Sequence, residues 1–322
     1  MNDLVELLRK SVIPAVPVPF TSRREIDEPA MRRYADWMAQ QTVGAVALWA
    51  HTGRGLLLSP AERALVLDVW RESLGATPII CGVGAQQPHD LPNDATQRTK
   101  RVIDLTVGMA ESAKSGGAAV VLVYPPTSLR GLPDRDSRML ELHRSVAAVG
   151  LPAILFYLYE AAGGISYSLD TIAELLDIDG VVGIKLATLD SVVTFQDVAA
   201  IASQRTGKLL ISGEDRFLGY SLMLGADSVL IGMAAACTDK CVELLEAWFE
   251  KDLSRFVQVA AKIDEFAGRT FTSPLDGYVQ RMLWALEADG VLVDEAHDPF
   301  GPDMEDSERD RVCEAVRRLR QK

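Results

Sequence analysis

The chain alternates along most of its length between short apolar segments and longer amphipathic ones. Eight apolar segments are each followed by a segment in which apolar residues recur with the helical period. The apolar segments are almost continuously hydrophobic, as expected of strands that are covered on both faces. They lie at residues 13–20, 45–50, 78–83, 118–124, 152–159, 181–187, 208–213 and 228–233. Eight strand and helix units predict an α/β fold, a (β/α)8 TIM barrel.

The alternation ends near residue 250, and the segments at 254–266, 274–286 and 307–320 are helical in pattern. We therefore expect a barrel with an N-terminal helix at 1–250 and a C-terminal helical extension at 251–322. A doubly wound open sheet fits the same alternation, but it is usually opened by a glycine-rich phosphate fingerprint, which this sequence lacks. The polar stretch 86–100 is long for a βα loop and is expected over the barrel face where active sites form.

Composition excludes several classes of partner. The formal net charge is -12 and the pI is near 4.9, so binding to nucleic acid or to an anionic membrane surface is not expected. The four cysteines are scattered and lack partners at metal-binding spacing, which favours free thiols over a metal site. Neither a secretory leader nor an apolar stretch of transmembrane length is visible, so we expect a cytoplasmic protein.

One predicted strand carries a lysine in its middle. Residues 181–188 read VVGIKLAT, and strand alternation places Gly183, Lys185 and Ala187 on one face. If that face lines a closed barrel, the small neighbours leave room for a ligand, and burial lowers the lysine pKa. A neutral amine at such a place is a nucleophile towards carbonyl groups. The alternative is an edge strand whose lysine extends to water.

Other polar residues follow the predicted strands at their C-terminal ends, where a TIM barrel builds its active site. The residues concerned are His51, Thr52, Gly53 and Arg54 after the second strand, Tyr124 after the fourth, Tyr157 and Tyr159 in the fifth, and Ser212, Gly213, Glu214 and Asp215 after the seventh. Hydroxyl groups, glycine-containing turns, an arginine and the lysine therefore converge. A carboxylate cluster suited to a divalent metal is not apparent.

Three of these segments resemble the dihydrodipicolinate synthase and N-acetylneuraminate lyase superfamily of class I aldolases. GIKLAT at 183–188 is similar to the segment around the family's Schiff-base lysine. AHTGRGLLLS at 50–59 stands where the family has its carboxylate-binding turn, and LLISGED at 209–215 is similar to the turn after the seventh strand. The resemblance covers about residues 13–249 and continues more weakly through 274–286. It implies a TIM-barrel lyase that uses neither a metal nor an organic cofactor.

The resemblance also implies roles for individual residues. Lys185 forms the Schiff base with pyruvate or another 2-oxo acid, and Thr52 takes part in proton relay. Counting back from Lys185 places the family's relay tyrosine on Tyr157, whereas aligning on residues 152–155 places Phe156 there; Tyr159 is a further candidate. We predict Tyr157, because it has a hydroxyl group that transfers protons.

The substrate-binding residues implied by the resemblance include Gly53, whose turn presents backbone amides to the substrate carboxylate, together with Tyr124 and Gly213. His51 replaces the family's first threonine and adds an imidazole that acts as an acid or base, binds an anion or is structural. Arg54 replaces the usual glutamate and is interpreted as a substrate contact or as a salt-bridge partner in the surrounding structure. His51 and Arg54 are both among the predicted substrate-binding residues.

A third departure concerns the second substrate. EAAGG at 160–164 lacks the arginine with which synthases acting on aspartate semialdehyde bind a second carboxylate. We therefore predict an aldolase, lyase or dehydratase acting on another small-molecule 2-oxo acid. One alternative is a true 4-hydroxy-tetrahydrodipicolinate synthase in which Arg54 or Arg130 substitutes. Another is a barrel that binds a keto acid or sugar acid without catalysis. The resemblance further implies a homo-oligomer, a dimer or tetramer.

Overall fold

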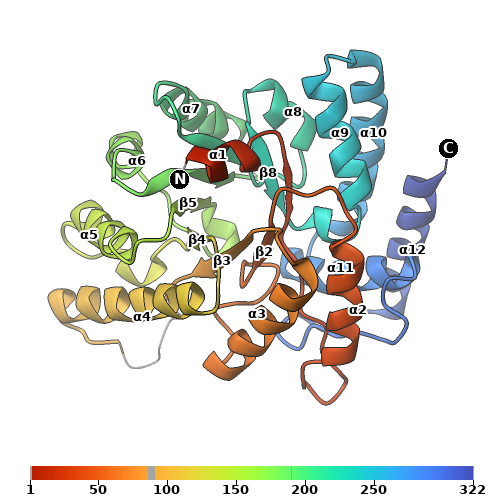
Figure 1. The fold of residues 1–322 in the computed structure, drawn as a ribbon, viewed down its shortest axis with the longest axis horizontal. Helices are drawn as coiled ribbons and strands as arrows, with labels where there is room; N and C mark the ends of the chain where they lie inside the picture. The colour runs from red at the N-terminus through yellow and green to blue at the C-terminus, as the bar shows by residue number, and fades with distance from the viewer. Residues whose placement is uncertain (1, 86–90, 190, 322) are drawn as a thin grey trace.

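The computed structural model describes residues 2–85, 91–189 and 191–321, and within them eight parallel strands form a barrel (Figure 1). Successive strands pair in chain order, and β8 pairs with β1. A parallel bridge between Ala15 and Ala47 joins the first strand to the second and closes the ring. The strands are β1 (Val12–Pro14), β2 (Val46–Leu48), β3 (Ile79–Val83), β4 (Val120–Val123), β5 (Ala153–Leu158), β6 (Val181–Ala187), β7 (Leu209–Ser212) and β8 (Ser228–Ile231). The predicted (β/α)8 architecture is confirmed.

A helix follows each strand and packs on the outside of the barrel. These helices are α2 (Glu28–Met38), α3 (Pro60–Leu74), α4 (Ala95–Ser115), α5 (Arg135–Ala147), α6 (Leu169–Leu176), α7 (Val192–Ser203), α8 (Leu218–Met223) and α9 (Thr238–Phe249). A further helix, α1 (Asn2–Leu8), precedes the barrel. Its Val5 and Leu8 belong to the same apolar cluster as Ala45 and Val120 at the strand starts, so α1 covers the N-terminal end of the barrel.

Two predicted boundaries were wrong. The first strand was expected over 13–20, but β1 is short, because Pro14, Pro17 and Pro19 have no N–H group for a strand ladder. The polar stretch 86–100 was expected to be a loop, but α4 begins at Ala95. Asp94 caps this helix by accepting a hydrogen bond from the Gln97 N–H at 2.8 Å. Residues 86–90 of the expected loop lie outside the described residues.

Side chains of each strand alternate between the barrel interior and the helical layer. In β5, Ile154, Phe156 and Leu158 pack in the interior cluster, whereas Leu155 and Tyr157 pack in the outer one. This alternation decides which side chains of the fifth strand reach the centre of the barrel.

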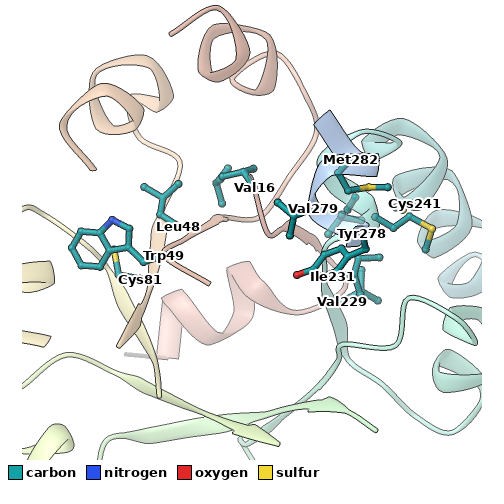
Figure 2. Packing of buried hydrophobic residues seen from close by; sticks show 14 of the residues in the cluster. Val16, Leu48, Trp49, Cys81, Val229, Ile231, Cys241, Tyr278, Val279 and Met282 are labelled. Carbon is teal, nitrogen blue, oxygen red and sulfur yellow. The ribbon is translucent and has the colours of Figure 1, made fainter. Parts of the chain in front are cut away.

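The C-terminal extension consists of α10 (Leu253–Thr270), a single 3-10 turn η4 (Leu275–Gly277), α11 (Tyr278–Ala288) and α12 (Asp306–Arg320). Helices α10 and α12 lie together at one edge of the molecule (Figure 1). Figure 2 shows the start of α11 against the barrel, with Tyr278 close to Ile231 of β8 and with Val279 beside it. The extension therefore reaches the C-terminal end of the barrel. Within the described ranges, no helix combines the length and apolar character needed to cross a membrane.

Candidate active site

A cavity of about 310 Å³ lies at the C-terminal ends of the strands. Its walls come from the segment after β2, from β5 and β6, from the segments after β7 and β8, and from the C-terminal extension. Four residues of the predicted site line it: His51, Thr52, Lys185 and Gly213. This is the end at which TIM barrels place their catalytic groups, so the cavity is the candidate active site.

Lys185 projects into this cavity from the middle of β6. Its side chain is only 6% exposed, and Nζ lies 4.2 Å from the centre of the Phe156 ring. Burial lowers the lysine pKa from 10.5 to about 8, although the nearby carboxylates of Asp215 and Glu214 oppose this shift. A substantial fraction of this amine is therefore neutral at mildly alkaline pH, when it is a nucleophile.

Gly213, after β7, allows the lysine to lie where it does. A Cβ atom at this position would stand 2.7 Å from Lys185 Cε and 2.7 Å from the Leu186 carbonyl oxygen. A larger residue would therefore displace the lysine. The structure thus gives Gly213 a definite reason to be glycine, in addition to the substrate contact that the sequence predicts.

Two buried carboxyl groups follow Gly213. Asp215 lines the cavity and accepts a hydrogen bond from the Met233 N–H at 2.7 Å. Glu214 accepts from the N–H groups of Thr188 and Leu189 at 2.6 and 2.9 Å, and so fixes the segment after β6. Burial raises the pKa of both carboxyl groups to about 7. The sequence places this pair at a strand end but does not reveal which carboxyl group enters the cavity.

A hydrogen-bonded chain of three side chains lines another part of the cavity. Tyr278 Oη lies 2.9 Å from His51 Nδ1 and 3.1 Å from Thr52 Oγ1. Burial, reinforced by the charge of Arg54, lowers the His51 pKa to about 4, so the imidazole is neutral at pH 7. Burial raises the pKa of the Tyr278 hydroxyl. Tyr278 was not predicted from the sequence, because it lies in the helical extension far from the recognised motifs.

The predicted relay tyrosine does not enter the cavity. Tyr157 packs in the outer layer, with its ring 5.9 Å from that of Tyr167, and Phe156 occupies the inward position beside Lys185. Tyr159 follows the end of β5 and does not belong to the lining either. Strand alternation therefore turns the Tyr157 side chain away from Lys185.

Two further predicted contacts lie beside the cavity. Tyr124 donates its hydroxyl hydrogen to the Trp49 carbonyl oxygen at 2.9 Å, and its ring packs 5.8 Å from that of Phe156. Gly53 forms the tight turn next to Thr52, where a Cβ atom would stand 2.9 Å from the Val16 carbonyl oxygen. Neither residue belongs to the cavity lining, although Gly53 is adjacent to a residue that does.

Arg54 lies below the cavity wall in a network of ion pairs. Its guanidinium lies 2.7 Å from Asp276 Oδ1 and 2.6 Å from Asp298 Oδ2, and the side chain is 6% exposed. It therefore ties the turn after β2 to the C-terminal extension. Arg130, the other arginine considered for binding a second carboxylate, donates to the Gly164 carbonyl oxygen. No arginine occurs among the described residues that line the cavity.

The described part of the chain contains no group of three or more His, Cys, Asp or Glu residues arranged to hold a metal ion. The four cysteines are free thiols, and Cys237 Sγ and Cys241 Sγ are 3.8 Å apart in the helical layer. The chemistry available in the cavity is thus that of an amine, the carboxyl groups of Asp215 and Asp276, two hydroxyl groups and an imidazole.

The chain is similar to known proteins in both sequence and fold. Residues 8–319 match the sequence profile of the Dihydrodipicolinate synthetase family. A 4-hydroxy-tetrahydrodipicolinate synthase from Saccharophagus degradans is 28% identical over 212 residues, which cover 65% of each chain. A dihydrodipicolinate synthase from Oceanobacillus iheyensis superimposes with a TM-score of 0.81 at 20% identity, covering 98% of each chain. An N-acetylneuraminate lyase from Mycoplasma synoviae superimposes with a TM-score of 0.77 at 16% identity, covering 97% of this chain and 98% of that one.

Proposed function

The chain belongs to the dihydrodipicolinate synthetase family, and we propose that it forms a Schiff base between Lys185 and a 2-oxo acid such as pyruvate. Membership makes it a lyase of the class I aldolase type, the class that the sequence predicts. The observation that carries the proposal is the amine of Lys185, buried in a cavity at the C-terminal end of the barrel with its pKa lowered to about 8. Such an amine attacks ketones.

The chemistry begins when the Nζ lone pair adds to the ketone carbon of the acid. The carbonyl oxygen takes up protons and leaves as water, which gives a positively charged iminium. This cation draws electrons from the adjacent carbon, so that a bond from that carbon to hydrogen or to a further carbon breaks and an enamine forms. Protonating the enamine, or adding it to an aldehyde, gives a new iminium, and water then hydrolyses this iminium to release the product and the free Lys185 amine.

Asp215 supports the charged intermediate. The iminium keeps one positive charge in a buried site, where an ionised carboxylate stabilises it more strongly than it would in water. Because burial holds the pKa of Asp215 near 7, this carboxyl group is divided between its two forms at neutral pH. We therefore assign Asp215 to binding the cation in its ionised form.

The 2-oxo acid carboxylate is assigned to the turn at Thr52 and Gly53. Thr52 lines the cavity, and the close packing of Gly53 against the Val16 carbonyl oxygen keeps the turn compact. Backbone N–H groups in a glycine turn are suitable donors for an anion. The neutral His51 beside Thr52 adds a polar group without adding a charge.

The rest of the cavity favours an uncharged group on the second part of the substrate. Leu158, Leu189, Phe271 and Leu275 form apolar walls, and Asp276 lies at the same opening. A second carboxylate would meet apolar walls and a like charge there, without the bidentate arginine that such a group needs. This supports a substrate other than the acidic aldehyde of lysine biosynthesis, with true 4-hydroxy-tetrahydrodipicolinate synthase as the alternative. Condensation of pyruvate with aspartate semialdehyde at an ordinary enzymatic rate would establish that alternative.

A second candidate function is binding without turnover. Phe156 at the inward position of β5 favours it, because that side chain transfers no proton. A ligand-induced rise in thermal stability without an imine would support this candidate.

The decisive experiment traps the imine. The protein is incubated with pyruvate and then with a panel of 2-oxo acids, reduced with borohydride and analysed by intact and peptide mass spectrometry. We expect a reduced adduct on the peptide that holds Lys185, and its loss in Lys185→Ala. Failure to trap any acid, with protein shown to be folded, would refute the Schiff-base proposal.

We further propose that the enzyme acts in the cytoplasm as a homo-oligomer, a dimer or tetramer. The chain has only four cysteines, none of them placed in a disulfide, which suits a reducing compartment. The assembly proposal comes from the family resemblance; one solved relative is described as a monomeric dihydrodipicolinate synthase variant. Sedimentation at micromolar concentration tests the assembly.

A further inference from the structure

We propose that Tyr278, supplied by the C-terminal extension, transfers protons to and from the bound substrate through Thr52. This inference rests on the proposed Schiff-base function and adds a catalytic group to it. Tyr278 lines the cavity that contains Lys185, although it stands 93 positions further along the chain, at the first residue of α11.

The reaction needs a proton carrier beside the reacting carbon. Forming the enamine removes a proton from that carbon, and releasing the product returns one. The inward residue of β5 is Phe156, and the Tyr124 hydroxyl is bonded to the Trp49 carbonyl oxygen. Among the described residues that line the cavity, only Thr52 and Tyr278 carry hydroxyl groups. Because Asp215 is assigned to the charge of the iminium, we assign the transfer to these two hydroxyl groups.

Their geometry suits a relay. Tyr278 Oη lies between Thr52 Oγ1, at 3.1 Å, and His51 Nδ1, at 2.9 Å. Both separations fall within hydrogen-bonding range, so protons pass along the chain by exchange between neighbouring atoms, without rearrangement of the side chains. The Tyr278 hydroxyl donates its proton to Thr52 Oγ1, so its oxygen accepts from neutral His51, which carries its proton on Nδ1 at the far end of the chain.

Each transfer is balanced. When the iminium loses a proton, the carbon–hydrogen bond breaks, its electrons form the carbon–carbon double bond, and the iminium nitrogen becomes neutral. In the arrangement that the structure shows, protons move the other way, towards the substrate. The Thr52 hydroxyl proton passes to the enamine carbon or to the oxygen of an aldehyde that adds to it, the Tyr278 proton passes to Thr52 Oγ1, and the His51 Nδ1 proton passes to Tyr278 Oη, while His51 Nε2 takes up a proton from water. The same steps in reverse, after the hydroxyl hydrogens turn about their C–O bonds, remove the proton from the iminium.

The ring of Tyr278 is held in place for this role. It stacks on Phe271 with centroids 4.8 Å apart and lies nearly parallel to the His51 ring, with an interplanar angle of 12°. A Cβ atom at Gly232 would stand 3.0 Å from both the Tyr278 ring and Thr52 Oγ1, so this glycine leaves room for their contact. Figure 2 shows Tyr278 packed beside Ile231 and Val279. A hydroxyl group on a fixed ring is preorganised for transfer.

The test measures proton transfer separately from imine formation. Wild type and Tyr278→Phe are incubated in D2O with the 2-oxo acid that borohydride traps best, and exchange of the hydrogens next to its ketone is followed by NMR. We expect Tyr278→Phe to retain the reduced adduct on Lys185 at saturation, but to exchange at least about 100-fold more slowly, the scale of a lost acid–base group. Adding Phe156→Tyr is expected to restore part of the exchange, because it places a hydroxyl group beside Lys185.

The matched control is Tyr34→Phe, which removes a buried hydroxyl bonded to the Ala235 carbonyl oxygen at 2.9 Å, outside the cavity lining. With this variant, the hydrogens next to the ketone should exchange at the wild-type rate. Unchanged exchange in Tyr278→Phe, or an equal loss in Tyr34→Phe, overturns the relay. Absence of any adduct in folded wild type instead refutes the underlying Schiff-base function, so the two failures are distinguishable.

Discussion

Phe156 and Lys185 are register partners on neighbouring strands, and the lysine Nζ lies 4.2 Å from the centre of the phenylalanine ring. The ring excludes water from one side of the amine while its π face attracts a cation. Because burial is the largest influence on the lysine pKa and lowers it, exclusion of water outweighs the attraction. The pair thus favours the neutral amine.

The first prediction concerns pH. The rate of imine trapping should rise with pH and level off above about 8, as Lys185 loses its proton. Phe156→Ala should move the midpoint upwards, towards the ordinary lysine value of 10.5, because water enters beside the amine. Borohydride trapping between pH 6 and pH 10 measures the midpoint.

The control for this prediction is Phe20→Ala, which removes a buried ring that packs on Phe300, outside the cavity lining. It should destabilise the fold by a similar amount, about 3–5 kcal/mol, and leave the midpoint unchanged. An unaltered midpoint in Phe156→Ala would show that the ring does not set the lysine pKa.

The second prediction is a substitution that lowers the pKa of Lys185 instead of raising it. The charge of Asp215 raises the pKa of Lys185 against the effect of burial. Asp215→Asn keeps an oxygen that accepts from the Met233 N–H but removes this charge, so the midpoint should fall below 8 by about 1 pH unit. The trapping rate at low pH then rises, although turnover should decrease because the iminium loses its counter-charge. A midpoint that stays at wild-type pH would contradict this electrostatic role.

The sequence was sufficient to predict the barrel and the position of its lysine. Eight mostly apolar strands, each followed by a helix, together with the missing phosphate fingerprint, favoured the closed barrel over an open sheet. Strand alternation within 183–187 correctly predicts that the side chains of Lys185 and Ala187 face the cavity. It was harder to predict which side chains of the fifth strand face the cavity. Both Phe156 and Tyr157 are apolar enough for either face, and the ladder with β6 changes register between Ala153 and Ile154. Counting from the lysine therefore gave Tyr157, whose side chain packs in the outer layer.

Long-range contacts explain the other differences. Tyr278 reaches the cavity because α11 packs on the 3-10 turn that follows β8 (Met233–Ala235), and a single sequence carries no local signal for this packing. Arg54 follows a similar pattern, since both of its carboxylate partners, Asp276 and Asp298, are more than 200 positions away. A motif identifies where a strand ends, whereas the partners of its side chains are known only from the folded chain.

The third prediction is that Arg54 contributes mainly to stability. Arg54→Met would leave Asp298, whose side chain is 1% exposed, without its cation, which typically costs about 3–5 kcal/mol. Urea unfolding should show this loss. Arg32→Met, which removes an exposed ion pair with Glu72, should leave the unfolding midpoint nearly unchanged.

The kinetic part of this prediction separates the two interpretations of Arg54. If the arginine acts only through the ion-pair network, folded Arg54→Met should need the same concentration of 2-oxo acid for half-maximal trapping as wild type. A rise of tenfold or more would instead indicate that the guanidinium contacts the substrate carboxylate.

The last prediction concerns the second part of the substrate. Wild type should trap 2-oxo acids that carry an apolar side group more readily than those with a second carboxylate, because Leu158, Leu189 and Leu275 line that region and Asp276 repels an anion. Ala162 lines the same cavity, so Ala162→Arg would place a guanidinium near the incoming group. This change should shift the ratio of acidic to apolar acids trapped by about tenfold or more in favour of the acidic ones, corresponding to about 1.4 kcal/mol. Ala162→Met supplies a long side chain without charge and should leave the ratio on the apolar side. If wild type already prefers the dicarboxylic acids, the assignment of an uncharged substrate group is wrong, and the synthase alternative gains support.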